Sequence, residues 1–477
     1  MSTMSLSFSR HRRRKGGSGA FSAISDYHLM ESLKNLRLSF FLIAALTLGG
    51  TSQDVWFPKI ILIAISIVLI GLTLAETNRA RLSSLIRPPF IFGILLVALY
   101  VLYLVPLPPD LWTRLPGREP IVDTYALINA ATPGVEVNLP WMPLSLMPEK
   151  TLGGLLCLIP VSAVALILGT SAQPSEVRLS IDALILFAIA NIGLAVLQSV
   201  LQISAVHPYE TTNAGLATGL FSNANHFGLF IAMIIPFAWY RVYRRLIKRN
   251  DRVQGFDLMG PLSSIFLILA IGAIALSGSV AAIGLGALAF LGSVAITSRR
   301  LKVTYLLGLA GLGTIILLSD IFILDGLLID LVGNFRSDSE LSRANMAKTG
   351  LTMLAEYNLA GVGPGAVPEA YTQFEDPARI NRVFVNQLHN DVLQFLIEFG
   401  LAGMLLCLAA IISFFALLWK NIARLSRNRR PLIFALVALL PLLHSSLDYP
   451  LRTMGIAVLF TYAWILASHV QAQRRHR

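Results

Sequence analysis

The chain has 477 residues, of which 55% are hydrophobic and only 13% are charged, and its mean hydropathy is +0.69. A water-soluble domain of this length cannot bury so much apolar surface, so the composition excludes a soluble globular protein and predicts a polytopic membrane protein. The formal net charge of +12 would also suit nucleic-acid binding. However, the basic residues flank the apolar runs, which indicates membrane orientation and no nucleic-acid partner.

Apolar runs of membrane-spanning length recur along most of the chain, each bounded by Pro, Gly or charged residues, and about twelve transmembrane helices are predicted. The predicted spans are Leu36–Gly50, Phe57–Ala75, Pro88–Leu107, Thr151–Thr170, Ser180–Ile203, Asn225–Tyr240, Leu262–Ser277, Val280–Thr297, Val303–Ser319, Asp391–Trp419, Leu432–Leu447 and Arg452–His469. The predicted fold class is an all-α polytopic membrane protein with one long extracytoplasmic loop that contains amphipathic helices.

The lysines and arginines divide unevenly across this topology. If the N-terminus is cytoplasmic, 28 of the 38 lysines and arginines fall on the cytoplasmic side, and the positive-inside rule therefore predicts this orientation. Both termini are then cytoplasmic. A basic, disordered tail of residues 1–35 and a basic tail of residues 471–477 flank the transmembrane region 36–470.

The long loop of residues 320–389 is the largest polar stretch and is expected to carry the active site. Ser337-Asp338-Ser339 offers helix-capping side chains, and the apolar residues that follow lie largely on one face of a helix up to Tyr357. Gly361-Val362-Gly363-Pro364-Gly365 then ends this helix. The pattern predicts an amphipathic helix on the membrane surface.

The strongest candidate for chemistry is His389-Asn390-Asp391, where the loop enters the next span. Asn390 and Asp391 are typical of a cap and first turn, and an outward-pointing helix N-terminus binds anions such as phosphate. Asp391, Gln394 and Glu398 follow on one face of the apolar helix, so they must face a cavity or a partner rather than lipid. Interhelical hydrogen bonding explains this stripe as well as a binding site does.

Two other polar segments border the predicted outer face. Asn225 lies in the polar run Thr218–His226 at the entry to a span, where it can cap a helix or bind sugar hydroxyls. His444, Asp448 and Arg452 surround a short outer turn, in which Asp448 and Arg452 can simply pair and His444 can be a hydrogen-bonded packing residue. Arginine suits phosphate because its planar fork binds two oxygens at once, although most loop arginines are solvated surface residues.

These segments resemble the O-antigen ligase and O-antigen polymerase superfamily. The shared motifs are Gly361-Val362-Gly363-Pro364-Gly365, then Tyr371, then His389-Asn390-Asp391 with Leu393-Gln394, Glu398, Gly400 and Gly403. Further matches extend the resemblance over Trp141–Ala467: Trp141–Leu146, Gly219–Asn225, and His444-Ser445 with Asp448–Arg452.

Two departures from the family pattern stand out. Ser277-Gly278-Ser279-Val280 replaces a frequent Ser-Arg-Gly, so one phosphate-binding arginine is absent there. Asn223-Ala224-Asn225 replaces Asn-Pro-Asn.

The resemblance implies a membrane glycosyltransferase of the bacterial cytoplasmic membrane, acting at its periplasmic face without a cofactor. Its donor is a polyprenyl-pyrophosphate-linked glycan and its acceptor is a lipid core, a protein or a growing polysaccharide. His389 is expected to act as the base or to orient the acceptor, while Arg343 and Arg452 hold the pyrophosphate. The other expected substrate-binding residues are Asn390, Asp391, Gly363, Gly365, Tyr371, Asn225, His444 and Asp448.

The residue chemistry fits this scheme independently of the resemblance. Pyrophosphate is a good leaving group that needs charge stabilisation more than protonation, so arginines and a helix terminus can suffice without a metal. The acceptor hydroxyl must lose a proton, and histidine titrates near neutral pH as a general base should.

Other interpretations remain open. A transporter of lipid-linked glycan would tend to show inverted repeats and interrupted mid-membrane helices, of which only Gly278 gives a hint. A scaffold without catalysis would leave His389 and Arg343 without a reason to lie together. A metal site would have to use Asp338, Glu340, Glu375 and Asp376, whose spacing matches no known site. The sequence does not separate ligase from polymerase.

Overall fold

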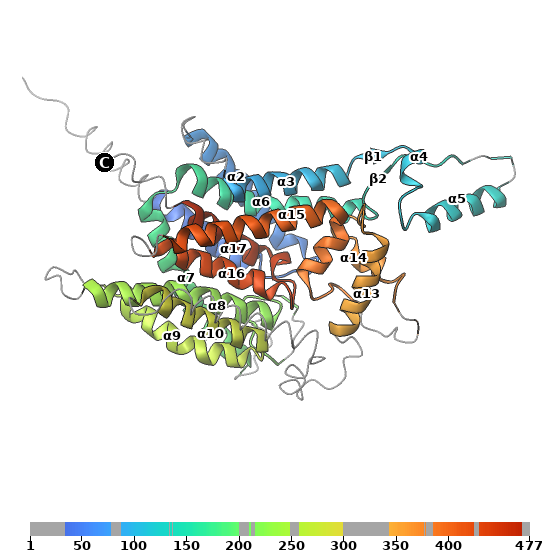
Figure 1. Ribbon diagram of the computed structural model, residues 1–477. Helices are drawn as coiled ribbons and strands as arrows, with labels where there is room; N and C mark the ends of the chain where they lie inside the picture. The colour runs from blue at the N-terminus through green and yellow to red at the C-terminus, as the bar shows by residue number, and fades with distance from the viewer. Residues whose placement is uncertain are drawn as a thin grey trace, which may run out of the picture.

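The computed structural model describes residues 34–77, 87–132, 134–135, 137–199, 209–210, 215–248, 257–298, 343–375, 377, 385–423 and 429–469. Over these residues the chain is a bundle of apolar helices (Figure 1). The long helices are residues 34–48, α2 (Trp56–Glu76), α3 (Pro88–Tyr103), α6 (Pro148–Leu166) continued by η2 (Ile167–Ser171), α7 (Pro174–Ser199), α8 (Ala224–Lys248), α9 (Met259–Leu276), α10 (Val280–Thr297), α15 (Asp391–Ile422), α16 (Arg430–His444) and α17 (Met454–His469).

Seven of the helices in the described ranges are long and apolar enough to cross a membrane, and α3, α16 and α17 are shorter apolar helices. The predicted all-α membrane fold is therefore confirmed. Eleven of the predicted spans lie on helices, while Val303–Ser319 falls outside the described residues. The number of twelve spans stays a prediction.

The predicted span Pro88–Leu107 is too long at its end. Its helix, α3, stops at Tyr103, because Pro106–Leu107 forms strand β1, which pairs antiparallel with β2 (Met142–Pro143). Between these strands the chain leaves the bundle as an arm that carries α4 (Pro109–Trp112) and α5 (Glu119–Ala131), visible at the right of Figure 1.

Helices α8, α16 and α17 form the centre of the bundle. Their apolar side chains belong to one large buried cluster, and α8 is the most buried of the candidate spans. A helix that is buried all round must be apolar all round, which α8 is from Phe227 to Trp239. This central packing fixes where the ends of α8 and α16 lie, and the candidate site is built on those ends.

A second, smaller apolar cluster lies at the end of the bundle where α15 begins (Figure 1). It joins α13 (Arg343–Glu356), α14 (Val367–Tyr371) and the first turns of α15. A helix is present at Arg343–Glu356, as predicted, but Leu351 of the predicted apolar face is exposed, and the expected caps at Ser337–Ser339 lie outside the described residues. That this helix belongs to one long extracytoplasmic loop stays a prediction. Protein rather than the membrane surface covers its buried face, since Met346 and Met353 pack in this cluster.

Candidate functional site

Three segments that are distant in sequence meet at this end of the bundle. They are Asn223–His226 at the start of α8, His389–Asp391 at the start of α15, and Asp448–Thr453 between α16 and α17. The Asp391 backbone N–H donates to the Asp448 carbonyl at 3.1 Å, which ties the second segment to the third. We call the side chains of His389, Asp448, Asn225, Tyr449 and His226 the site cluster.

Helix caps place two of these segments. Asn390 caps α15, because its side-chain oxygen accepts from the Leu393 N–H at 2.9 Å, as the sequence predicted. At the start of α8 the capping oxygen comes from Asn223, which accepts from the Asn225 N–H at 2.8 Å. The Asn225 side chain therefore does not cap the helix and instead binds Asp448.

A buried carboxylate orients the imidazole of His389. The Nδ1 atom of His389 lies 3.1 Å from Oδ1 of Asp448, whose side chain is fully buried, while the His389 side chain is 30% exposed. The Asn225 amide donates to the other oxygen of Asp448 at 2.7 Å, and the Tyr449 N–H donates to Oδ1 at 2.9 Å. The second ring nitrogen of His389, Nε2, is thereby left for a ligand.

Asp448 stays ionised in this setting. Burial alone would raise the pKa of its carboxyl, but the hydrogen bond with His389 and the charges of His389, His226 and Arg343 hold the pKa well below its ordinary value. Burial and the charge of Asp448 also raise the pKa of Tyr449 to about 12, so this phenol stays protonated. The carboxylate and the imidazole form a dyad in which Asp448 fixes the orientation of the His389 ring.

The backbone of His389 is strained. Its φ of 52° makes it the one non-glycine residue with positive φ in the described ranges. A left-handed conformation costs an ordinary L-residue on the order of 1–2 kcal/mol, and such strain clusters at functional sites. The ring also packs edge-on against Tyr449, with centroids 4.8 Å apart. The fold thus holds this imidazole in one position despite an unfavourable backbone.

Two further histidines lie beneath the dyad. His226 is buried, its Nδ1 lies 2.8 Å from the Thr453 hydroxyl, and its ring packs edge-on against Tyr449 at 5.2 Å. His444, a predicted substrate-binding residue, is also buried, and its backbone carbonyl accepts from the Asp448 N–H at 2.9 Å. Nε2 of His226 and Nδ1 of His444 have no hydrogen-bond partner among the residues that the structure describes.

Arg343 is the first residue of α13 and lies near the site cluster. Its positive charge acts on Asp448, Tyr449 and His444. No carboxylate in the described part of the chain forms an ion pair with Arg343, and its side chain is only partly buried. Arg343 thus lies near Asp448, the partner of His389, and its role at the site stays a prediction.

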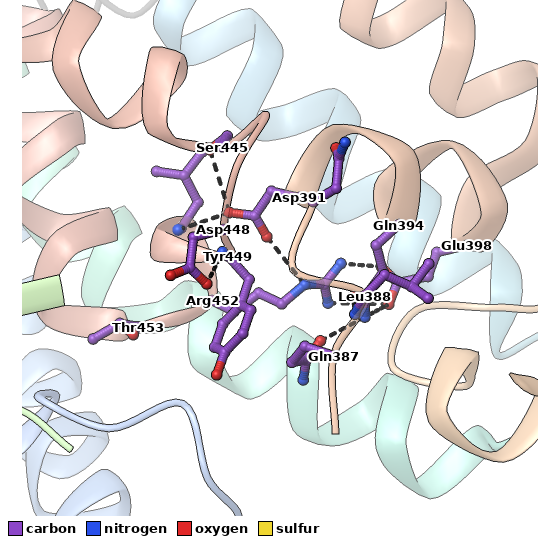
Figure 2. Close-up of polar contacts among 12 residues, drawn as sticks. Gln387, Leu388, Asp391, Gln394, Glu398, Ser445, Asp448, Tyr449, Arg452 and Thr453 are labelled. Carbon is purple, nitrogen blue, oxygen red and sulfur yellow. Dashed lines mark hydrogen bonds and ion pairs between the residues drawn. The ribbon is translucent and has the colours of Figure 1, made fainter. Parts of the chain in front are cut away.

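Arg452 lies beside the site cluster with its guanidinium already engaged (Figure 2). Two of its nitrogens donate to the two oxygens of Glu398 at 3.0 Å each, and Nε lies 3.1 Å from Asp391. Gln394 donates to the same Glu398 at 3.3 Å. The polar stripe on α15 thus faces protein partners, as the interhelical alternative held. Asp448 and Arg452, which the sequence allowed to pair, have separate partners.

The glycine segment wraps around a kink in α15. The N–H of Val362 donates to the backbone carbonyl of Ile397 at 3.0 Å, and the N–H of Gly363 donates to the backbone carbonyl of Glu398, also at 3.0 Å. Gly363 has φ +97°, and a Cβ there would lie 2.2 Å from the hydroxyl of Ser145. This turn is therefore possible only for glycine, and it serves packing as well as any binding role.

Two other expected binding residues also have structural partners. The backbone N–H of Gly365 donates to Glu398 Oε1 at 3.0 Å, so it helps to hold the carboxylate that binds Arg452. Tyr371 is buried in the second apolar cluster.

The segment that lacks the expected arginine forms the turn between α9 and α10. The Ser279 hydroxyl caps α10 by accepting from the Ala282 N–H at 3.3 Å. A Cβ on Gly228, in the first turn of α8, would lie 3.0 Å from the hydroxyl of Ser277. The turn therefore lies about one helical turn from Asn225, and it holds no arginine.

The metal alternative is not tested by the structure. Three of its four residues, Asp338, Glu340 and Asp376, lie outside the described residues. Within the described ranges, no three His, Cys, Asp or Glu side chains are grouped as a metal ion would need.

Residues 265–408 match the family model described as O-Antigen ligase. The matched region contains Arg343, the glycine segment and His389, but it ends before Asp448 and Arg452. The resemblance is confirmed for this region, and its wider extent over Trp141–Ala467 stays a prediction. No curated protein matches the chain. Together with the apolar helices, the match supports a membrane protein of the O-antigen ligase or polymerase type.

Proposed function

We propose that this protein transfers a polyprenyl-pyrophosphate-linked glycan to an acceptor hydroxyl, with His389 as the general base. The observation that carries the proposal is the dyad in which buried Asp448 binds Nδ1 of a partly exposed His389. The family match over residues 265–408 supplies the reaction class. The acceptor is a lipid core, a protein or a growing polysaccharide.

In the proposed reaction the acceptor oxygen attacks the anomeric carbon of the donor sugar. The new carbon–oxygen bond forms as the bond between that carbon and the pyrophosphate oxygen breaks. The acceptor proton passes to Nε2 of His389, and polyprenyl pyrophosphate leaves as the anion. Asp448 keeps the ring oriented and stabilises the imidazolium, so Nε2 stays in place to accept the proton.

Arg343 is the residue that we assign to the pyrophosphate. Its charge acts at the site cluster and it has no ion-pair partner among the described residues, so binding a phosphate oxygen breaks no described ion pair. A planar guanidinium stabilises the charge that develops on the leaving group. Arg452 is already bound by two carboxylates, and we assign it the task of positioning α15 against the α16–α17 turn.

The proposed orientation puts the site cluster at the periplasmic face and both termini in the cytoplasm. It is supported by the 28 of 38 lysines and arginines that fall on the opposite side. A lipid-linked donor is anchored in the membrane, so its pyrophosphate lies near the membrane surface, where the ends of the membrane helices also lie.

The direct test is glycan transfer by the purified full chain, with lipid-linked glycan and a hydroxyl acceptor in nanodiscs. We expect His389→Ala to slow transfer by about 10²–10⁴-fold, the usual contribution of a general base. Ser446→Ala, in the neighbouring outer turn, is the matched control and should retain the parental rate. A parental rate in His389→Ala would eliminate the proposed role. We expect a metal chelator to leave the transfer rate unchanged, and a loss of activity in chelator would favour the metal alternative.

Deletion of the gene separates ligase from polymerase. Loss of glycan chain length with single units still attached to their acceptor indicates a polymerase. Full-length chains that never reach an acceptor indicate a ligase. Unchanged surface glycans of every kind would contradict both activities and leave a transporter or scaffold to consider.

A further inference from the structure

A groove of about 440 Å³ opens at the end of the bundle opposite the site cluster. It lies between the first turns of α7, the last turns of α8 and the first turns of α16. The α8 residues that line it begin at Phe237, about twelve residues beyond Asn225, which is on the order of 18 Å along the helix. The groove is therefore separate from the proposed active site.

The walls of the groove divide into an apolar floor and a cationic rim. Phe237, Ile433 and Phe434 are buried and form the floor together with partly buried Val177 and Ile181. The rim carries five arginines, which come from all three helices. They are Arg178, Arg241, Arg244, Arg245 and Arg430. Such a groove matches a ligand with an apolar portion and an anionic portion.

Acidic groups neutralise only part of the rim. Arg241 forms an ion pair with Asp182, and Arg245 donates to the backbone carbonyl of Asp257 at 3.0 Å. Asp257 is the one carboxylate on the lining among the residues that the structure describes. Arg178 and Arg244 are exposed and form no ion pair with any residue in the described ranges. The groove therefore keeps an excess of positive charge.

The helix ends add to this charge and locate the groove at the membrane boundary. The N-termini of α7 and α16 both lie at this end, and each contributes the positive end of a helix dipole. Tyr240 also lines the groove, and tyrosines favour the level of lipid head groups. A basic pocket between membrane helices at that level is suited to a lipid phosphate.

We infer that this groove binds an anionic phospholipid, with the head-group phosphate on Arg178 and Arg244 and the start of an acyl chain on the Phe237 and Phe434 floor. Arginine can bind two phosphate oxygens at once, and the neighbouring apolar floor distinguishes a lipid from a free phosphate ion. The inference is independent of the proposed transferase activity, since it uses none of the residues of the site cluster.

Native mass spectrometry of the detergent-purified full chain tests this. The probes are phosphatidylglycerol and phosphatidylcholine, with millimolar inorganic phosphate as a competitor. We expect the parent to retain phosphatidylglycerol more strongly than phosphatidylcholine and to be unaffected by phosphate. Arg178→Gln and Arg244→Gln should each weaken phosphatidylglycerol binding about fivefold, which corresponds to about 1 kcal/mol per basic residue near the membrane surface.

The control is Lys420→Gln, which removes an exposed positive charge near the end of α15 that does not line the groove. It should bind phosphatidylglycerol as the parent does. Parental binding by the double variant Arg178→Gln/Arg244→Gln would overturn the inference, as would equal retention of phosphatidylcholine. Displacement of the lipid by inorganic phosphate would also overturn it and identify a soluble anion. If the double variant does not fold, the exposed single variants carry the same comparison.

Discussion

His389 and Asp448 are 59 residues apart in the sequence, yet Nδ1 of the one lies 3.1 Å from Oδ1 of the other. Their meeting depends on two capped helices. Asn390 caps α15 directly after His389, and Asn223 caps α8 so that Asn225 reaches the second oxygen of Asp448. The α8 and α15 caps thus position both groups that contact the Asp448 carboxylate, which are the Asn225 amide and the His389 imidazole.

We predict that Asp448→Asn slows glycan transfer by about 10²–10⁴-fold while the protein still folds. An amide fills the same space, but it carries no charge to stabilise the imidazolium and can leave His389 in the wrong tautomer. Asn225→Ala removes a single hydrogen bond to Asp448 and should cost about tenfold or more, since hydrogen bonds to charged groups contribute roughly 1.5–3 kcal/mol. Transfer rates of the two variants, normalised to folded protein, measure this order. A parental rate in Asp448→Asn would exclude the dyad.

The depressed pKa of Asp448 predicts how stability depends on pH. A carboxyl whose pKa is lower in the folded than in the unfolded protein stabilises the fold when ionised. This contribution is fully present above the ordinary aspartate value of about 3.9 and is lost as pH falls through the lower, folded-state pKa. The parent should therefore lose melting temperature on acidification below that value more steeply than Asp448→Asn does. Parallel melting curves for the two proteins across acid pH in detergent would contradict the prediction.

Arg343→Gln should weaken use of the donor without unfolding the protein. Arg343 pairs with no carboxylate in the described part of the chain, so its loss leaves no described partner uncompensated. Loss of a charge-assisted contact to pyrophosphate should lower kcat/KM for the donor by about 10–100-fold. Lys348→Gln on the same helix, an exposed residue, is the matched control. Equal kcat/KM values for the two variants would remove Arg343 from the pyrophosphate site.

The membrane helices were predictable because they depend on local composition. Predicted and observed boundaries agree for Val280–Thr297, and the start of α15 was predicted from the capping chemistry of Asn390. Tyr103 shows the limit of this approach. The residues after it are as apolar as a span requires, but α3 ends there because Pro106 cannot donate a helical hydrogen bond and, with Leu107, pairs with a distant strand.

Partner choice at the site was not predictable in the same way. Sequence placed His389, Asp448 and Arg452 at one face, but helix packing decided that Asp448 binds the histidine and Glu398 binds the arginine. His226 and Tyr449 were not recognised as parts of the site. Their positions in the sequence could have indicated this, because His226 follows Asn225 directly and Tyr449 follows Asp448 directly.

Arg452 gives the sharpest test between positioning and substrate binding. Its guanidinium lies between Glu398 and Asp391, and the stripe that holds it also holds Gly365 through Glu398. Removing one member of a buried ion pair leaves the other charge uncompensated and costs about 3–5 kcal/mol. We therefore expect Glu398→Ala and Arg452→Ala to lower the melting temperature together, and the double variant to be less destabilised than the sum of the two. If Arg452 instead bound pyrophosphate, Arg452→Ala would abolish transfer at an unchanged melting temperature, and Glu398→Ala would leave donor KM unchanged. Melting curves and donor KM for the three variants distinguish these outcomes.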